Sequence, residues 1–422
     1  MKRLLLSALI ILLLLNIINS QTWIEQTSGV GTALYSVSAA DDHNVWVCGD
    51  AGKVLRTVNG GTNWVSVGAT PIPSTLPLYC IFGIDSLTVL VTGSTTTATF
   101  LYRTSNGGAN WVQVFTQTGG FIDAVSMGNA SAGFFVGDPV GGRWTLFGTV
   151  TGGLTWDSAQ FRLPQAGTET GYNNSFFFDP VSQAVWFGTN NTRVYRSTNL
   201  ILWGTEPTTG EINSDAMYFT SSTNGMCGGT LVLFTTNAGA VWTPVATSMP
   251  GTAAVLGITG ITSNWWVIRQ AAQVYFTYNN GTNWSTSYTA PAGAYLHLTQ
   301  SRAGTPALYA ARDNGGISKG TNLLVGVQHS SGDVPKEYSL SQNYPNPFNP
   351  TTNIKYQIAK NSFVTLKVFD ILGREVATLV NGQLKAGSYE SHFDGNNFAS
   401  GTYFYKLKAG DFTETRMLVL LK

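Results

Sequence analysis

The sequence predicts an all-β protein: a seven-bladed β-propeller followed by a small C-terminal β-sandwich. A phrase of the form Asn-Gly-Gly-x-x-Trp recurs at intervals of roughly 40–50 residues, the period of propeller blades. The chain holds 47 glycines, 12% aromatic residues and only 11% charged residues, which suits short strands joined by tight turns. The seven copies of the phrase centre on turn residues Asn59, Asn106, Thr151, Asn199, Asn237, Asn279 and Asn322.

One repeat unit shows how the phrase relates to a blade. Leu34–Ala39 alternates like an inner strand, and Val45–Cys48 is an apolar run typical of a central strand. Lys53–Arg56 is expected to run back along the central strand as a third strand. The turn at Asn59 follows it, and Trp64–Val67 begins a fourth strand. Glycines supply the positive φ angles of the turn, and the Trp covers it. We therefore expect four strands and three hairpins per unit, with the phrase serving the scaffold rather than a site.

The last unit predicts how the ring closes. Asp313–Lys319 aligns with a third strand, but the Trp position of this unit falls at Val327. Trp23–Gln26 precedes the first inner strand and has the pattern of an unpaired fourth strand. We expect this N-terminal segment to join the last blade and close the ring.

Composition shifts divide the chain into four segments. Residues 1–20 have a basic start, a short apolar run and a small residue at Ser20, the pattern of a secretory signal peptide. Residues 21–326 form the propeller, 327–337 a polar linker, and 338–422 the sandwich. A net charge of +1 gives no electrostatic footprint for nucleic acid or anionic membrane. We expect Cys48, Cys80 and Cys227 to be buried, unreactive thiols; a Cys48–Cys80 bridge is the weaker alternative.

The repeats resemble two propeller groups. Their turn is similar to the Asp-box, or BNR, repeat of sialidase-like propellers, whose pattern is Ser/Thr-x-Asp-x-Gly-x-Thr-Trp, with Asn mostly in place of Asp. The longer unit is more similar to the photosystem II stability and assembly factor propellers. The resemblance covers about residues 22–326 and implies a fold rather than a ligand.

The C-terminal segment resembles the sorting domain of type IX secretion substrates in Bacteroidota. The resemblance rests on a proline-rich turn, a hairpin turn, a Ser-Gly-Thr-Tyr-Phe strand start and a terminal strand ending in Lys. Within these elements the sorting-signal residues that the resemblance implies are Tyr344, Pro345, Asn346, Pro347, Phe348, Asn349, Gly373, Arg374, Gly401, Tyr403 and Lys422. It also implies export by way of the periplasm, a secreted or cell-surface location, and the type IX machinery as partner.

The sequence predicts no catalytic residue, no metal site and no cofactor. A sialidase needs converging arginines and a tyrosine paired with a glutamate. Arg56, Arg103 and Arg196 share one repeat position, which favours a scaffold role. His297 lies in an expected inner strand, where a satisfied core or channel histidine is the better interpretation than a ligand. Asp123 and Asp215 also lie in expected inner strands, near the axis.

We therefore expect a non-enzymatic binding or scaffold module for an extracellular glycan or protein, with the ligand-binding residues unknown. A degenerate, sialidase-like glycoside hydrolase and an envelope assembly factor are the alternatives. The use of a propeller face for binding rests on analogy between folds.

Overall fold

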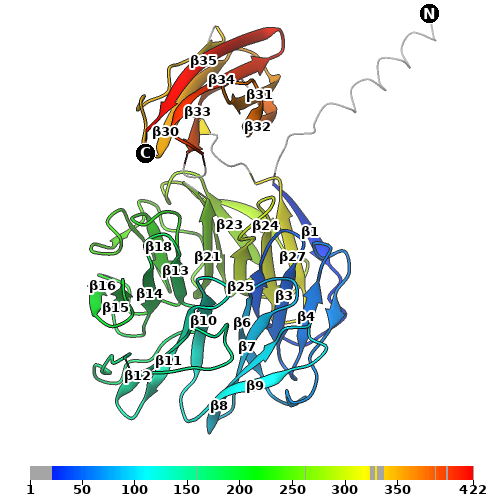
Figure 1. The fold of residues 1–422 in the computed structure, drawn as a ribbon, viewed down its shortest axis with the longest axis vertical. Helices are drawn as coiled ribbons and strands as arrows, with labels where there is room; N and C mark the ends of the chain where they lie inside the picture. The colour runs from blue at the N-terminus through cyan, green and yellow to red at the C-terminus, as the bar shows by residue number, and fades with distance from the viewer. Residues whose placement is uncertain are drawn as a thin grey trace, which may run out of the picture. The chain divides into compact units, whose positions relative to one another are not determined.

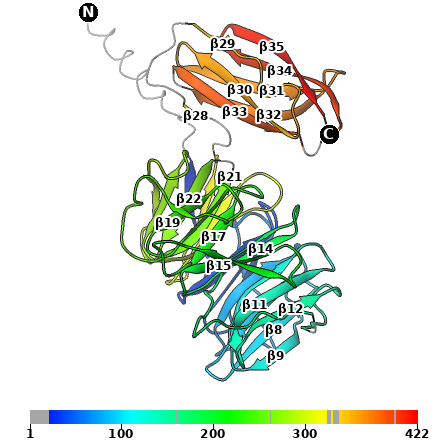
Figure 2. The same cartoon turned by 90° about the vertical axis from the view of Figure 1, so that its left-hand side faces the viewer.

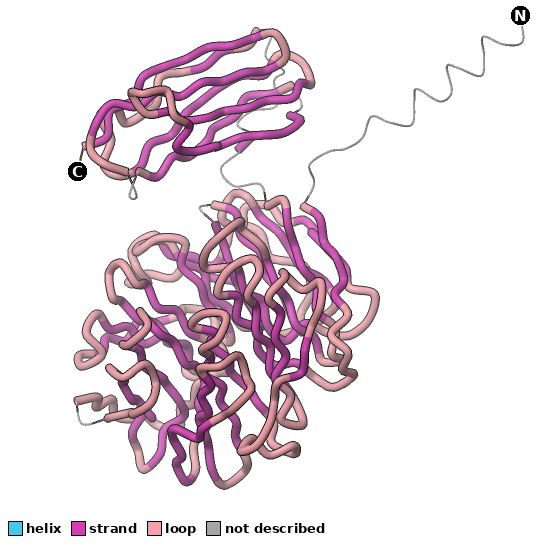
Figure 3. The backbone as a smooth tube through the Cα atoms, turned by 45° about the vertical axis from the view of Figure 1, so that its right-hand side comes forward, coloured by secondary structure: helices cyan, strands magenta, loops and turns pink. Residues whose placement is uncertain are grey.

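The computed structural model describes residues 21–158, 160–261, 263–323, 328–329, 337–384, 386–395 and 398–421. The expected signal peptide, Lys422 and most of the expected linker, including Val327, lie outside these residues. The described chain folds as strands and loops only (Figure 3), so it holds no helix that could cross a bilayer. It separates into two compact units, Trp23–Thr321 and a second that contains Asn322–Lys422.

The first unit contains seven antiparallel sheets that follow one another along the chain (Figure 1). Blade 1 contains β2 (Leu34–Ala39), β3 (Val45–Gly49), β4 (Val54–Thr57) and β5 (Val65–Ser66). Blade 2 contains β6 (Leu78–Gly83), β7 (Val89–Ser94), β8 (Ala98–Thr104) and β9 (Val112–Thr118). Blade 3 contains β10 (Ile122–Met127), β11 (Gly133–Val140) and β12 (Arg143–Thr149). Blade 4 contains β13 (Phe176–Asp179), β14 (Ala184–Gly188), β15 (Arg193–Ser197) and β16 (Trp203–Pro207). Blade 5 contains β17 (Ala216–Phe219), β18 (Gly225–Gly228), β19 (Val232–Thr235) and β20 (Thr243–Pro244).

Blade 6 contains β21 (Val255–Ile261), β22 (Asn264–Arg269), β23 (Gln273–Thr277) and β24 (Ser285–Thr289). Blade 7 contains β25 (Tyr295–Gln300), β26 (Leu308–Arg312), β27 (Ile317–Thr321) and the N-terminal β1 (Thr22–Gln26), which pairs with β27. The expected ring closure by the N-terminal strand is thus confirmed.

The closing strand is held by side chains as well as by the sheet. Glu25 forms an ion pair with Arg312, whose side chain is almost fully buried, and accepts hydrogen bonds from Ser318 Oγ (2.6 Å) and Tyr288 Oη (3.0 Å). The guanidinium of Arg312 also lies over the ring of Tyr295. Because Arg312 is buried, its pairing with Glu25 makes the closure depend on the N-terminal strand.

The apolar core lies between neighbouring blades. One cluster joins blades 1 and 2 through Trp46, Val54, Leu78 and Val89, and similar clusters follow around the ring. The second strands of blades 1, 4 and 6 are buried along their whole length, as their continuous apolar runs predict. Cys48 and Cys227 lie in the second strands β3 and β18, and Cys80 lies in the first strand of blade 2, β6. All three are buried and outside any disulfide, and burial raises the pKa of each thiol; that of Cys80 rises to about 12. The expectation that the three cysteines are buried is confirmed, and Cys48 and Cys80 form no disulfide; their lack of reactivity stays a prediction.

Blade 3 differs from the expected four-stranded unit. Its described strands number three, because the chain after Trp156 leaves the sheet instead of running back along β12. Only two bridges return to β12, one between Gly148 and Asp157 and one between Arg143 and Pro164. Pro164 has no backbone N–H to donate, so it suits a broken edge of this kind.

The second unit is formed by two four-stranded antiparallel sheets, whose strands are labelled in Figure 2. One sheet contains β28 (Gln328–His329), β33 (Gly387–Asp394), β30 (Thr351–Ile358) and β29 (Ser339–Leu340). The other contains β32 (Glu375–Leu384), β31 (Ser362–Phe369), β34 (Gly401–Ala409) and β35 (Phe412–Leu420). Both sheets contribute alternate residues to one apolar core, in keeping with the alternating pattern of these strands.

Candidate binding groove between blades 3 and 4

The recurring turn is held together by its own side chains. In blade 1, Thr57 Oγ1 accepts a hydrogen bond from Gly61 N and donates one to Asn59 Oδ1, both at 2.9 Å. Asn59 Oδ1 also accepts the N–H of Asn63 at 3.0 Å. The same Thr–Asn–Gly bonds recur around Thr104, Thr235 and Thr277. The side chains of the turn therefore serve local structure, as the repeat predicts.

Cations on third strands tie blades to their neighbours. A side-chain N–H donates to the backbone carbonyl of a glycine in the turn of the next blade. These pairs are Arg56 with Gly107, Arg103 with Gly152 and Lys319 with Gly60, at 3.4, 2.7 and 2.9 Å. Arg196, at the same repeat position, lies over the ring of Trp186. These contacts agree with the scaffold role expected for the three arginines.

Blade 3 breaks this pattern at Gly148. The strand pairing places Gly148 opposite Phe134. The equivalent pairs elsewhere are Trp46 with Arg56, Leu90 with Arg103, Trp186 with Arg196, Met226 with Phe234, Trp266 with Phe276 and Tyr309 with Lys319. No side chain therefore reaches from position 148 toward the turn of blade 4. Phe161 lies against the glycine instead, so close that an added Cβ would be 2.6 Å from its ring.

In blade 3, as in blade 4, the tryptophan of the turn bonds within its own turn rather than to the preceding blade. In blade 2, Trp111 Nε1 donates to Val67 O of the preceding blade at 2.8 Å. Trp156 Nε1 donates instead to Gly153 O, within its own turn, at 3.1 Å. The missing arginine and the missing fourth strand of blade 3 leave space between blades 3 and 4.

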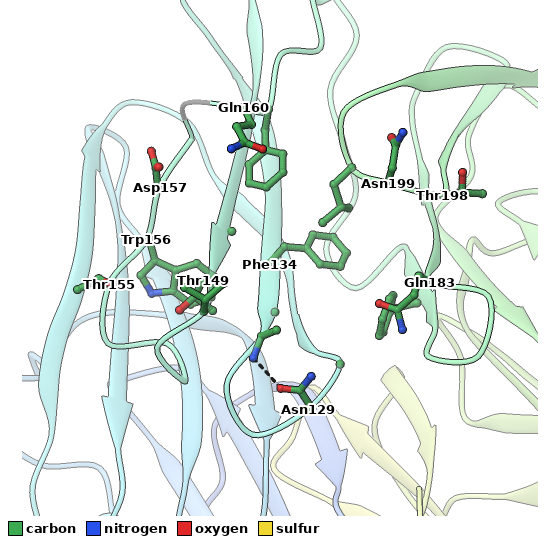
Figure 4. A pocket seen from close by; sticks show the side chains of 18 residues that line it. Asn129, Phe134, Thr149, Thr155, Trp156, Asp157, Gln160, Gln183, Thr198 and Asn199 are labelled. Atoms are coloured by element: carbon green, nitrogen blue, oxygen red, sulfur yellow. Dashed lines mark hydrogen bonds between the residues drawn. The ribbon is translucent and has the colours of Figure 1, made fainter.

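That space is a groove of about 700 Å³, within the range of ligand sites. Figure 4 shows Phe134 pointing into it, with Trp156 on one side and the Asn199 turn on the other. The aromatic lining residues are Phe134, Trp156, Phe161 and Phe178, and the longer polar ones are Asn129, Asp157, Gln160, Gln183, Thr198 and Asn199. This site was not predicted from the sequence. Gly148 stands at the repeat position where three other blades have an arginine, and this difference could have indicated it.

Two residues that lie near the axis of the ring are hydrogen-bonded to other blades. At one end Asn174 reaches across to blade 1, where its side chain bonds Ser36 Oγ (2.9 Å) and Tyr35 O (3.2 Å). Near the other end Arg302 donates to Ser38 Oγ (3.0 Å) and to the carbonyl of Gly83. The first contact joins the loop before blade 4 to blade 1, and the second joins blade 7 to blades 1 and 2, so both residues serve to join blades.

His297 fits the interpretation as a satisfied core residue. Its Nδ1 accepts the backbone N–H of Val37 at 3.0 Å, and burial lowers the pKa of the imidazole to about 4. The side chain is therefore neutral at physiological pH and bonded to the scaffold.

Two aspartates near the axis are buried without matching cations. Burial raises the pKa of Asp123 well above its usual range, and the neighbouring Asp138 carboxylate adds to the rise. Asp123 is covered by Gly171, where an added Cβ would lie 2.2 Å from its Oδ2. Burial, with a contribution from Glu211, raises the pKa of Asp215 to about 7. Because Asp123 is enclosed, it cannot meet a substrate as a general acid.

A tyrosine–glutamate pair does occur, between Tyr195 and Glu169. Tyr195 Oη donates to Glu169 Oε1 at 2.5 Å, and Arg193 lies 3.7 Å from the same carboxylate. Both partners are about 2% exposed, and Glu169 also accepts bonds from Trp144 Nε1 and Ala166 N. Burial, then the contact with Glu169, raises the pKa of Tyr195 to about 12, which opposes a nucleophilic role. The pair ties the loop before blade 4 to the blades.

One group of side chains has the composition of a metal site. Asp41, Asp42 and His43 offer ligand atoms within 4.8 Å of one another in an exposed turn. Asp41 Oδ1 already accepts the backbone N–H groups of His43 and Asn44 at 2.8 and 2.7 Å. These bonds explain the cluster as a side-chain-capped turn.

The proline-rich segment of the C-terminal unit lies along the last strand. Asn346 Oδ1 accepts Val419 N at 2.9 Å, and Asn346 Nδ2 donates to Met417 O at 3.3 Å. Phe348 continues the pairing through its backbone, donating to Val419 O and accepting from Leu421 N, both at 2.9 Å. These bonds cover the edge of β35 that β34 leaves open.

The other residues of the implied sorting signal have different surroundings. Phe348 is buried, whereas Tyr344, Pro345, Pro347 and Asn349 are exposed. Gly373 and Arg374 close the hairpin turn after β31, where Arg374 Nε donates to Asp370 Oδ2 at 2.7 Å. Gly401 begins β34, and Tyr403 Oη donates to Ala399 O at 2.8 Å. Gly401 and Tyr403 also contact the last strand, because β34 pairs with β35 at Leu420 and Leu418.

Comparison with known proteins places the two units separately. Residues 342–421 match the family described as "Secretion system C-terminal sorting domain". The match confirms the resemblance drawn from the C-terminal motifs, and it indicates an exported, secreted or cell-surface protein. Comparison with curated protein sequences gives no match.

Solved propellers share the fold of the first unit. YCF48 bound to D1 peptide aligns at a TM-score of 0.56 and 14% identity over 71% of this chain and 96% of that chain. YCF48 from Cyanidioschyzon merolae gives 0.56 and 15% over 71% and 98%, and the WD40 β-propeller domain of Doa1 gives 0.54 and 11% over 71% and 97%. The chain thus combines a propeller with the fold of YCF48 and a C-terminal secretion sorting domain.

Proposed function

We propose that this protein is a non-enzymatic binding module that holds an extracellular glycan or protein in the groove between blades 3 and 4. The observation that carries the proposal is the local break in the repeat at Gly148, which leaves aromatic rings and side-chain amides open in one place. Binding sites of proteins combine an apolar lining with a few oriented polar groups in this way.

The groove favours binding over hydrolysis. Glycoside hydrolases use two carboxyl groups on either side of the bond that is cleaved. The described lining holds a single carboxylate, Asp157. The buried Asp123 and Glu169 are enclosed by Gly171 and by Trp144, Ala166 and Tyr195. A degenerate hydrolase is therefore the weaker candidate.

A protein ligand is the second candidate. It is favoured by the likeness in fold to YCF48, one structure of which is titled as bound to D1 peptide. In that case the protein would act as an assembly factor for the cell envelope. The identity of 14% supports this only as an analogy between folds.

We further propose that the C-terminal unit carries the protein through the type IX secretion machinery by way of the periplasm. Removing residues 409–422 takes away β35 and with it the strand that Asn346 and Phe348 contact. We expect the truncated protein to be retained inside the cell. Its arrival at the cell surface in normal amounts would contradict the export proposal.

The binding proposal is tested with the mature full-length protein on arrays of glycans and of envelope proteins, alongside a set of chromogenic glycosides. We expect saturable binding on at least one array and no release of chromophore. Silence on both arrays with turnover of a glycoside would overturn it in favour of the hydrolase.

A further inference from the structure

Given the binding function proposed above, the side chains that line the groove limit the chemical class of ligand that it can bind. Its described lining contains no lysine or arginine, and its one ionisable side chain is that of Asp157. The repeat cations of blades 2 and 4 are engaged elsewhere: Arg103 donates to Gly152 O, and Arg196 lies over Trp186. Arg162 follows the lining residue Phe161 in the chain but is not itself part of the lining. A polyanion such as a uronate, sulfate or phosphate polymer needs cations at its site. The occupant is therefore a neutral molecule.

Two asparagine side chains present amide donors in set directions. Asn199 Oδ1 accepts the N–H groups of Ile201 and Leu202 at 3.0 and 2.8 Å. Asn129 Oδ1 accepts those of Ser131 and Ala132, both at 2.8 Å (the latter dashed in Figure 4). Since each oxygen is held by two backbone donors, the amide orientation is settled, and each Nδ2 is left to donate to something else.

The remaining polar groups can both donate and accept. Gln160 and the Thr198 hydroxyl line the groove without a hydrogen bond to any described residue, and Gln183 uses only its Nε2, which donates to Pro180 O at 2.7 Å. A ligand rich in hydroxyl groups matches this set, because each hydroxyl is a donor and an acceptor at once.

The aromatic floor is held in place by neighbouring rings. Phe134 meets Phe176 and Phe178 edge to face, with ring centres 5.1 and 6.0 Å apart, and Trp156 lies 4.9 Å from Phe135. Rings fixed in this manner offer flat apolar surface without further loss of conformational entropy. The C–H faces of pyranose rings fit such a surface.

An extended peptide fits the groove less well. Strand addition requires an edge with unpaired backbone groups. The edge of β12 is blocked at both ends, because Trp144 N donates to Leu163 O at 3.0 Å and Gly148 pairs with Asp157 in both directions. The groove is thus suited to side-chain recognition of a polyhydroxylated chain.

We infer that the groove between blades 3 and 4 binds a neutral polysaccharide, with the part-exposed rings of Phe178 and Trp156 under the sugar rings, the buried Phe134 supporting them, and Asn129 and Asn199 donating to its hydroxyl groups.

The test uses native electrophoresis of the mature full-length protein in gels that contain starch, xyloglucan, galactomannan or a β-1,3-glucan, with polygalacturonate as the charged comparison. We expect at least one neutral polysaccharide to retard the protein and polygalacturonate to leave its mobility unchanged. Retardation by none of the four neutral polymers would overturn the inference.

Two isosteric variants locate the site. Asn199→Asp and Asn129→Asp keep the oxygen that the backbone N–H groups need but remove the amide donor. Each lost hydrogen bond should weaken binding about threefold to tenfold. Asn237→Asp is the matched control, because Asn237 Oδ1 accepts Val241 N at 2.9 Å in the turn of blade 5, outside the groove.

The outcomes separate this inference from the proposed function. Neutral-polysaccharide binding that both groove variants retain in full would move the site elsewhere and leave the binding function standing. Binding of an array of neutral hydrophobic peptides that is sensitive to Asn199→Asp, with no polysaccharide binding, would assign the groove to a protein ligand. Both results would overturn the inference.

Discussion

Gly148 lies opposite Phe134 in the pairing of β11 and β12, at the position where three other blades pair the second strand with an arginine. The change removes the side chain that would reach the next blade, and a groove lined by Phe134, itself almost fully buried, lies beside it. A repeat architecture makes such a departure visible, because the other blades show what the position does when it serves the scaffold alone.

The arginine contact itself can be tested in blade 2. Arg103→Met keeps most of the apolar stem but loses the bond from Nε to Gly152 O. We expect a loss of about 1–2 kcal/mol in the free energy of unfolding of the propeller. Tryptophan fluorescence in urea reports on this unit alone, because all 12 tryptophans lie between Trp23 and Trp284. Arg143→Met, at an exposed position, should change the midpoint little; equal effects would contradict the role of the contact.

Glu25 should be the most sensitive position in the ring closure. Glu25→Gln removes the negative charge beside the buried Arg312, which is then left without a counter-charge. We expect a loss of about 2 kcal/mol, measured in the same unfolding experiment. Glu206→Gln, on the outer strand of blade 4, is the control. An unchanged midpoint for Glu25→Gln would show that β1 is held by its sheet pairing alone.

The stability of the propeller should depend on pH through Asp215. The pKa of this carboxyl in the folded protein is about 7, above its ordinary value of about 4. Its protonated form therefore stabilises the fold, fully so below about pH 4, and this contribution is lost as the pH rises toward 7. Asp215→Asn mimics the protonated state, so the variant should match the wild type near pH 4 and exceed it by about 2–4 kcal/mol at pH 8.

The control for this experiment is Asp313→Asn. Asp313 is exposed and accepts Ala294 N through Oδ1, a bond that asparagine can also accept. Its unfolding curve should follow the wild type at both pH values. An Asp215→Asn variant with the same offset at pH 4 and pH 8 would refute the raised pKa as the cause.

The role of the proline-rich segment can be tested with two asparagines three residues apart. Asn346→Ala loses both bonds to the last strand, whereas Asn349 is exposed and has no hydrogen bond to a described residue. We expect Asn346→Ala to lower the calorimetric transition of the C-terminal unit, at a cost of about 1–2 kcal/mol, and to reduce the amount at the cell surface. Asn349→Ala should change neither. If both variants lost export while the stability of the C-terminal unit stayed unchanged, this result would contradict the stabilising role. It would indicate that the secretion machinery recognises the segment directly.

Much of the fold could be predicted from local patterns. The inner strand expected at Leu34–Ala39 is β2, and the segment expected to close the ring, Trp23–Gln26, lies within β1. Turn chemistry and apolar periodicity act over a few residues, so they can be read from the chain directly. The fourth strand expected in blade 3 was wrong, because the segment after Trp156 keeps only two bridges to β12.

The chain alone determined the repeat, its closure and the export domain, since each depends on short motifs whose physics is local. Tertiary structure decided where a ligand can bind. The groove is the space that Gly148, Phe161 and the Asn199 turn leave between two blades, and its shape depends on packing between residues about 50 positions apart in the sequence. The enclosure of Asp123 and Glu169 and the hydrogen bond of His297 to Val37 were decided in the same manner, by neighbours that no pattern along the chain reveals.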